Sequence, residues 1–127
     1  MKMEFTLPGP PRTKKNSQRI FRNQKTGKPF VRASAAYEDF EAAAAYYLQP
    51  RPERPVDFPV AVRCVYYMPT RRRVDLTNLL EATHDVLVKC GILADDNSSI
   101  IYSVDGSRVR YDKENPRQEI TIEEGGP

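Results

Sequence analysis

Four polar residues, Asp75, Asn78, Glu81 and Asp85, recur at steps of three and four in a segment with helical apolar spacing. These steps keep the four side chains along one flank of a helix. Glu81 and Asp85 are both acidic and one turn apart, so they repel each other by roughly a few tenths of a kcal/mol. A cation held between carboxylates would remove that penalty. The plainer alternatives are helix capping by Asp75 and a solvated charged face.

A second acidic pair, Asp95 and Asp96, follows this helix after a turn at Gly91. The turn could return the pair toward the acidic flank of the helix. Carboxylate oxygens are hard ligands, and no cluster of His and Cys accompanies them. Such a donor set favours Mg²⁺, with Mn²⁺ as a substitute, over zinc. The two acidic groups together are therefore a candidate metal site.

The net charge of the chain is only +3, but it is unevenly distributed. Residues 1–32 hold nine Lys and Arg against Glu4 alone, and residues 51–73 hold six arginines against two acids. Residues 74–105 reverse the sign, with six acids against one lysine. Two basic segments followed by an acidic one favour a polyanion bound beside a carboxylate cluster. Solvated charged faces are the alternative explanation.

The elements that would position these groups alternate between strand and helix patterns. Strands are predicted at 3–7, 19–22, 29–32, 60–68, 99–111 and 118–122. One helix is predicted from Ser34 to the prolines that begin at Pro50, and a second from Asp75 to a stop at Gly91. The stripe expected to be buried on the first helix is Ala36, Phe40, Ala43, Ala44 and Tyr47. Grouped strands with two helices predict an α+β fold with a small mixed sheet.

The length of 127 residues suits one domain, predicted over 1–122, with a frayed tail at 123–127. No run approaches the roughly 20 apolar residues that a membrane span requires. The first residues lack the apolar core of a signal peptide. Cys64 and Cys90 lie among apolar residues, which is typical of buried free thiols rather than a disulfide. We therefore expect a cytoplasmic protein without a membrane partner.

Three short motifs resemble those of the RusA family, small and mostly phage-derived Holliday junction resolvases. They are PPRTKKN at 10–16, RVDLTNLLEATHD at 73–85 and DDNSSI at 95–100. Their order and spacing agree with the family over residues 5–111. The resemblance implies a small α+β fold and a homodimeric, Mg²⁺-dependent endonuclease. It also implies that the substrate is branched DNA such as a four-way junction.

The resemblance also implies roles for individual residues. The two carboxylates essential in the family fall on Asp75 and Asp96, and a third, lower on the helix, falls on Asp85. Thr77 stands where the family pattern D-x-D-N has its second Asp. Glu81 stands where some members carry a Lys. Glu81 lies one turn beyond Thr77, so it is the nearest carboxylate that could replace the missing one.

The basic segments would hold the phosphates that flank the cleaved bond. The candidate contacts are Lys14, Lys15, Asn16, Arg71, Arg72 and Arg73, while Thr77 and Asn78 add polar groups on the helix. His84 could act as a general base, but a single His on a helix is more typical of a surface residue. Two other functions fit the same residues: a branched-DNA-binding protein with impaired catalysis, and a structural phage protein whose basic loops contact another chain.

Overall fold

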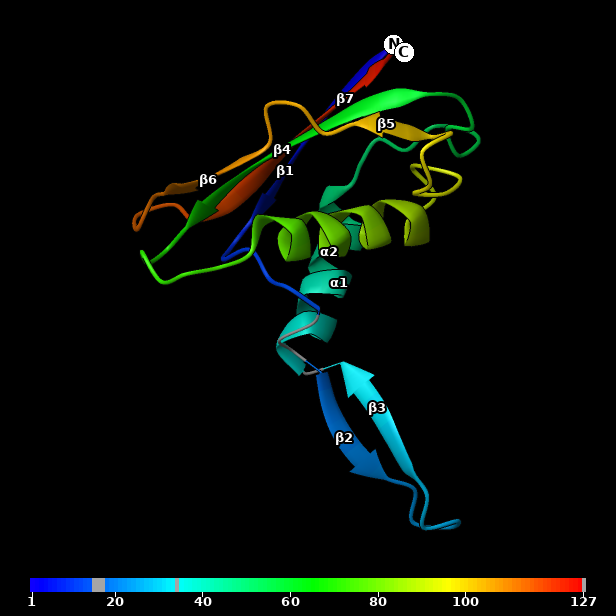
Figure 1. Ribbon diagram of the computed structural model, residues 1–127, viewed down its shortest axis with the longest axis vertical. Coiled ribbons are helices and arrows are strands. Elements are labelled where there is room, and N and C mark those ends of the chain that lie inside the picture. The colour runs from blue at the N-terminus through cyan, green and yellow to red at the C-terminus, as the bar shows by residue number, and fades with distance from the viewer. Residues whose placement is uncertain (15–17, 34, 127) are drawn as a thin grey trace.

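The computed structural model describes residues 1–14, 18–33 and 35–126. Its elements are β1 (Lys2–Pro8), β2 (Gln18–Arg22), β3 (Pro29–Ala33), α1 (Ala35–Tyr47), β4 (Val60–Met68), α2 (Leu76–Lys89), β5 (Ile101–Ser103), β6 (Arg108–Tyr111) and β7 (Arg117–Glu124). Five strands form a mixed sheet, and both helices lie on the same side of it (Figure 1). The β2–β3 hairpin projects away from the sheet. The predicted α+β fold, a small mixed sheet with two helices, is confirmed.

Strand β4 is the centre of the sheet. Antiparallel β7 lies on one side of it, while β5 and β6 pair with opposite ends of its other side in parallel. Its even-numbered residues from Val60 to Tyr66 are fully buried under the helices, whereas Arg63 is exposed. Successive side chains of a strand point to opposite faces. The odd-numbered residues of β4 therefore lie on the face turned away from the helices, here called the outer face.

Helix α2 has one buried stripe, and its residues follow the helical period. The buried side chains are Leu79, Leu80, Ala82, Thr83, Val86 and Leu87. The helix ends as expected at Gly91, where φ is +77° and where the next amide, Ile92 N, donates to Leu87 O at 2.9 Å. Because α2 connects β4 to the parallel β5, it crosses the buried face of the sheet. Asp75 is thereby placed at the end of the loop that leaves β4.

Helix α1 buries only part of the predicted stripe, with Phe40 and Ala44 packed inward as expected. Its packed side is formed by Tyr37, Phe40, Ala44 and Leu48. Three side chains expected in the core are exposed: Ala36, Ala43 and Tyr47. An alanine-rich helix carries small apolar residues on most sides, so apolar spacing alone does not choose the buried one. The misassigned residues line an open groove of about 280 Å³ between α1 and the chain that follows β1.

Two predicted strand boundaries also change. The strand expected at 99–111 is two strands, because Gly106, with φ +85°, turns the chain between β5 and β6. Strand β7 extends to Glu124, which pairs with Val60. Both cysteines are free thiols, as predicted, and burial raises the pKa of Cys64 to about 12. Among the helices described, none has the length and apolar character needed to cross a bilayer.

A buried hydrogen-bond network fastens α2 to the sheet. The hydroxyls of Thr83 on α2 and Tyr66 on β4 lie 2.6 Å apart, and Thr83 Oγ1 donates to Gln118 Oε1 on β7 at 2.8 Å. All three residues are almost fully buried. Leaving a polar group this deeply buried without a hydrogen-bond partner lowers the stability of the fold.

We predict that Thr83→Val destabilises the protein by about 1–3 kcal/mol, because it removes one partner of the Tyr66 hydroxyl and leaves the Gln118 side-chain oxygen without its donor in the core. Urea unfolding followed by circular dichroism measures this change. Thr6→Val, at an exposed position of β1, is the matched control. Equal stability of the two variants would show that the network contributes nothing.

Candidate active site

Asp75 occupies the N-cap position of α2 without using its side chain as a cap. Its backbone is extended, with φ −84° and ψ 119°, and no side-chain cap hydrogen bond forms. Asn78 Nδ2 donates to Asp75 Oδ2 at 3.2 Å. The carboxylate is exposed. The alternative of simple capping is thus not how this residue is used, and its oxygens face solvent at the positive end of the α2 dipole.

Asp85 is held in a charged cluster between α2, α1 and the basic segment after β1. Its Oδ2 lies 3.7 Å from Lys14 Nζ and 3.2 Å from Lys89 Nζ, and it accepts a hydrogen bond from the Tyr37 hydroxyl at 3.3 Å. Lys89 also pairs with Glu41 on α1 at 2.8 Å. Burial, with a smaller effect of the Asp85 charge, raises the pKa of Tyr37, so the phenol stays protonated as a donor.

Tyr37, Glu41 and Lys89 were not singled out from the sequence. The only signal available was Lys89, four residues after Asp85 and of opposite charge, a spacing that favours an ion pair on a helix. Tyr37 and Glu41 come from another element, and their approach to Asp85 depends on how α1 packs. In the structure, Asp85 anchors Lys14 of the basic segment to the α1–α2 pair.

The second acidic pair follows α2 and is exposed. The Asp95 side chain caps the next amide, because Asp96 N donates to Asp95 Oδ1 at 2.7 Å. The charge of Asp96 acts on His84, opposing the burial that lowers the pKa of that imidazole. His84 is not the surface residue expected: its Nε2 is buried and has no hydrogen-bond partner among the residues described. Asp96 therefore returns toward the His84 side of α2.

Asp85 and Asp96 have different neighbours. His84 and Asp85 are neighbours in the helix, so their side chains leave it about 100° apart. Asp85 faces α1, whereas Asp96 is near His84. His84 is also nine residues beyond Asp75, about 14 Å along the helix axis. The structure thus spreads the predicted carboxylates along and around α2.

Thr77 and Glu81 are both exposed on α2. The charge of Glu81 contributes to the raised pKa of Tyr37, which places it toward the α1 side. Within residues 1–14, 18–33 and 35–126, no three His, Cys, Asp or Glu side chains come together to hold a metal ion. The donor chemistry nevertheless suits Mg²⁺, which binds through one or two carboxylates, several waters and substrate phosphates. Asp75 is exposed and its side chain is not used in capping, so its carboxylate is available as such a ligand.

The basic residues predicted to bind phosphates lie beside α2. Arg71, Arg72 and Arg73 are exposed in the loop that precedes Asp75. None of these three arginines forms an ion pair with a described carboxylate. The Arg71 guanidinium lies over the Tyr111 ring, 4.3 Å from its centroid. Two further predicted contacts, Lys15 and Asn16, fall outside the residues described.

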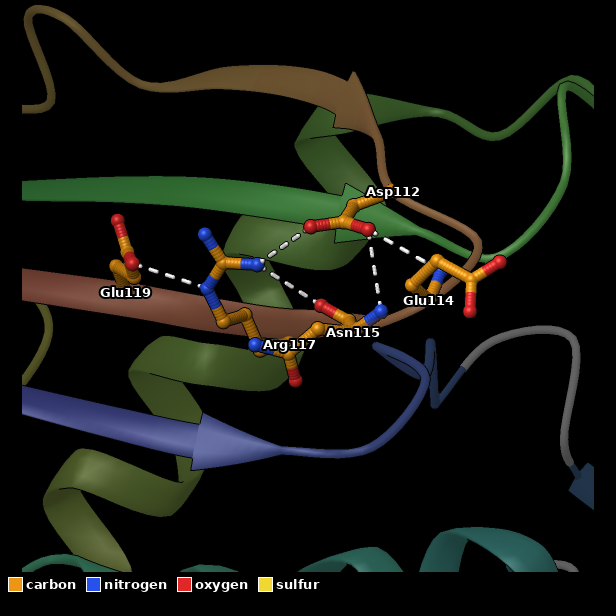
Figure 2. A network of polar contacts seen from close by, with 5 residues as sticks. All are labelled: Asp112, Glu114, Asn115, Arg117 and Glu119. Atoms are coloured by element: carbon orange, nitrogen blue, oxygen red, sulfur yellow. Dashed lines mark hydrogen bonds and ion pairs between the residues drawn. The ribbon is translucent and has the colours of Figure 1, made fainter.

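The β6–β7 turn supports this arginine loop from the sheet side. Asp112 N donates to Met68 O at 2.9 Å, which joins the turn to the start of the loop. Figure 2 shows how Arg117 fixes the turn: its guanidinium bonds to Asp112, Glu119 and the Asn115 carbonyl at 2.9–3.0 Å. The hydrogen bond from Arg117 lowers the pKa of Asp112. Because its donors are used in these contacts, Arg117 holds the turn in place and is not a candidate phosphate contact.

The chain is similar over most of its length to known proteins of one family. The family model described as Endodeoxyribonuclease RusA matches residues 8–123. The chain is 34% identical to the crossover junction endodeoxyribonuclease RusA of Escherichia coli strain K12 and to that of Enterobacteria phage 82. It is 33% identical to the corresponding protein of Shigella sonnei strain Ss046. Each match covers 96% of this chain and 94% of the relative. The chain therefore belongs to the RusA family of endodeoxyribonucleases.

Proposed function

We propose that this protein is a Mg²⁺-dependent, structure-selective endonuclease that acts in the cytoplasm and resolves Holliday junctions and related branched DNA by paired phosphodiester hydrolysis. The observation that carries the proposal is the exposed Asp75 carboxylate at the N-terminus of α2, two residues after the last of three exposed arginines. A carboxylate for the cation and guanidiniums for the phosphates are the two groups that such a reaction needs. Relatives named crossover junction endodeoxyribonucleases support it.

Asp75 and Asp96, with Asp95, Asp85 or Glu81 as further ligands, would hold one or two cations. Because these carboxylates are spread along α2, two cations, one at Asp75 and one at Asp96, fit the arrangement better. A bound Mg²⁺ supplies activation of water for attack on phosphorus and compensates charge on the leaving 3′ oxygen. Asn78 orients Asp75 through its hydrogen bond of 3.2 Å. The arginines of residues 71–73 hold the phosphates beside the cleaved bond, which restricts the approach of the scissile group.

We also propose a homodimer, because two symmetric active sites suit the two symmetric strands of a junction. The exposed side of α1 supports this. Tyr46 is 75% exposed and Tyr47 43% exposed, and the groove beside them is lined largely by apolar residues. An apolar surface of this kind on a small protein is typical of an interaction site.

Phosphate contacts from the first basic segment lead to a further prediction. Replacing Lys14 and Lys15 together with Ala should weaken junction binding to a similar extent for every DNA sequence. The slope of log affinity against log salt should fall by about one to two, because each lost phosphate contact releases about 0.9 fewer counterions. Fluorescence anisotropy at several salt concentrations measures both effects. An unchanged slope would mean that the lysines do not contact DNA.

The second candidate function is a branched-DNA-binding protein with impaired catalysis, and Thr77 in place of a family carboxylate favours it. A labelled four-way junction and a linear duplex of the same arm sequences separate the candidates. The proposed nuclease binds the junction in EDTA and cuts it, but not the duplex, in Mg²⁺. The impaired protein binds without cutting. A structural protein does neither, and either of these last two results contradicts the proposal.

A further inference from the structure

The outer face of the sheet carries a group of arginines that the site described above does not use. The register places Arg108 opposite Val65, and Arg110 opposite Tyr67. Residues paired across neighbouring strands share a face. Arg108 and Arg110 therefore point to the outer face, where Arg63 of β4 also lies. All three arginines are exposed.

These three guanidiniums have no carboxylate partner among the residues described. Arg63 Nη2 makes a long contact of 3.5 Å with the Thr121 hydroxyl, and Arg108 Nε donates to Gly106 O at 3.0 Å. Most of the five donors of each guanidinium thus remain available. Arg117 differs, because Asp112 and Glu119 neutralise it.

The local backbone is built around this group. Gly106 has φ +85°, and a Cβ there would come within 2.8 Å of the Arg63 Cδ atom. Because Gly106 has no side chain, Arg63 can lie across the β5–β6 turn. The Gly106 carbonyl accepts the hydrogen bond that orients Arg108. Farther along β4, at the position paired with Arg110, the Arg117 guanidinium stacks on the Tyr67 ring, 3.8 Å from its centroid. We call Arg63, Arg108 and Arg110 the outer arginine patch.

The patch continues the predicted phosphate-binding loop around the edge of the sheet. Arg110 precedes Tyr111, the residue on which Arg71 stacks. In the sheet described, β6 pairs only with β4, so Arg108 and Arg110 lie at an open edge. Figure 1 shows β6 and the 69–75 loop at the same end of the sheet, with the helices on one side only. At its other end the patch meets Asp105 and Glu123, which share a small pocket with Arg63.

We infer that the outer arginine patch binds the phosphate backbone of a second arm of the branched DNA whose junction lies at α2. The inference rests on the proposed function and extends it. Planar guanidiniums with free donors match phosphates in a bidentate manner. A straight duplex bound along the α2 side would contact the sheet only at its edge. In a branched DNA, a second arm that diverges from the junction could pass β6 and lie on the outer face. The patch would thus contribute to selectivity for branched DNA.

The test compares wild-type protein with Arg108→Ala/Arg110→Ala in EDTA, by anisotropy with a labelled four-way junction at several salt concentrations. We expect the double variant to bind about tenfold more weakly, with a salt slope lower by about 1.8, since two phosphate contacts are lost. Lys2→Ala, which removes a cation on β1 that is already paired with Glu4 and Glu123, should leave both values nearly unchanged. Arg108→Lys/Arg110→Lys should keep the salt slope, because the charges remain.

The single variant Arg110→Ala is included because it is expected to fold like the wild type. Arg110 makes no hydrogen bond or ion pair in the described part of the chain. Unchanged affinity and slope in the folded variants would overturn the inference. A changed oligomeric state in sedimentation, with junction affinity intact, would identify a protein contact and overturn it as well. Weaker junction binding by the double variant, together with a wild-type protein that never cuts DNA, would support the patch while contradicting the proposed nuclease.

Discussion

Asp75→Asn is expected to slow cleavage of a four-way junction about a thousandfold while leaving junction binding intact or tighter. Asparagine keeps the size of the side chain but removes the charge that attracts the cation. Losing roughly 4 kcal/mol of transition-state stabilisation corresponds to this factor. Binding is preserved because a negative charge near the phosphates disappears. Single-turnover cleavage in Mg²⁺ and anisotropy in EDTA measure the two effects separately.

Asp96→Asn should behave in the same way, and Asp95→Asn less severely, because the Asp95 side chain accepts the amide hydrogen bond of its neighbour. Asp105→Asn, an exposed carboxylate near the outer face, is the control and should cleave at the wild-type rate. Full activity in Asp75→Asn would remove this residue from the site.

Glu81→Gln is the second change with a large expected effect. If Glu81 replaces the carboxylate that the family pattern has at Thr77, its loss should reduce cleavage nearly as much as Asp75→Asn. Thr77 and Glu81 are both exposed on α2 and lie one turn apart. The long glutamate side chain can therefore reach back past Thr77 toward Asp75. High Mg²⁺ should restore part of the activity by mass action, because the variant weakens cation binding rather than removing the site.

Thr77→Asp should be tolerated, or should lower the Mg²⁺ concentration needed for cleavage, since it adds a hard oxygen ligand. Glu53→Gln, an exposed position in the connector before β4, is the matched control for loss of a glutamate charge. Wild-type cleavage by Glu81→Gln at limiting Mg²⁺ would show that Glu81 is only an exposed helix residue. Asp75, Asp85 and Asp96 would then remain as the working carboxylates.

The two helices show what the sequence could predict about the fold. Helix α2 mixes large apolar residues with polar ones, so its stripe from Leu79 to Leu87 has one interpretation and is found buried. Helix α1 is rich in alanine, and apolar spacing fits several of its sides. Only the burial of Tyr37 and its hydrogen bond to Asp85 on α2 select the observed side. The sequence pattern does not predict the turn at Gly106, because the residues on both sides of it have strand character.

The candidate site residues could be named from the sequence, but their arrangement could not. Steps of three and four correctly placed Asp75, Asn78 and Asp85 on α2, and the Asp75–Asn78 contact follows from that spacing. The partners of Asp85 come from α1 and from the segment after β1, which no local pattern relates to α2. The return of Asp96 to the His84 side depends on how the chain turns after α2.

The measurement that tests the nuclease assignment most directly is a single-turnover time course with a strand-labelled four-way junction over a range of Mg²⁺ concentrations. The proposed function predicts that the wild-type protein cuts two opposing strands at symmetric positions, that the rate rises with Mg²⁺ to a plateau, and that EDTA abolishes cleavage. A junction that is bound but stays intact at every concentration of Mg²⁺ and of Mn²⁺ would contradict it.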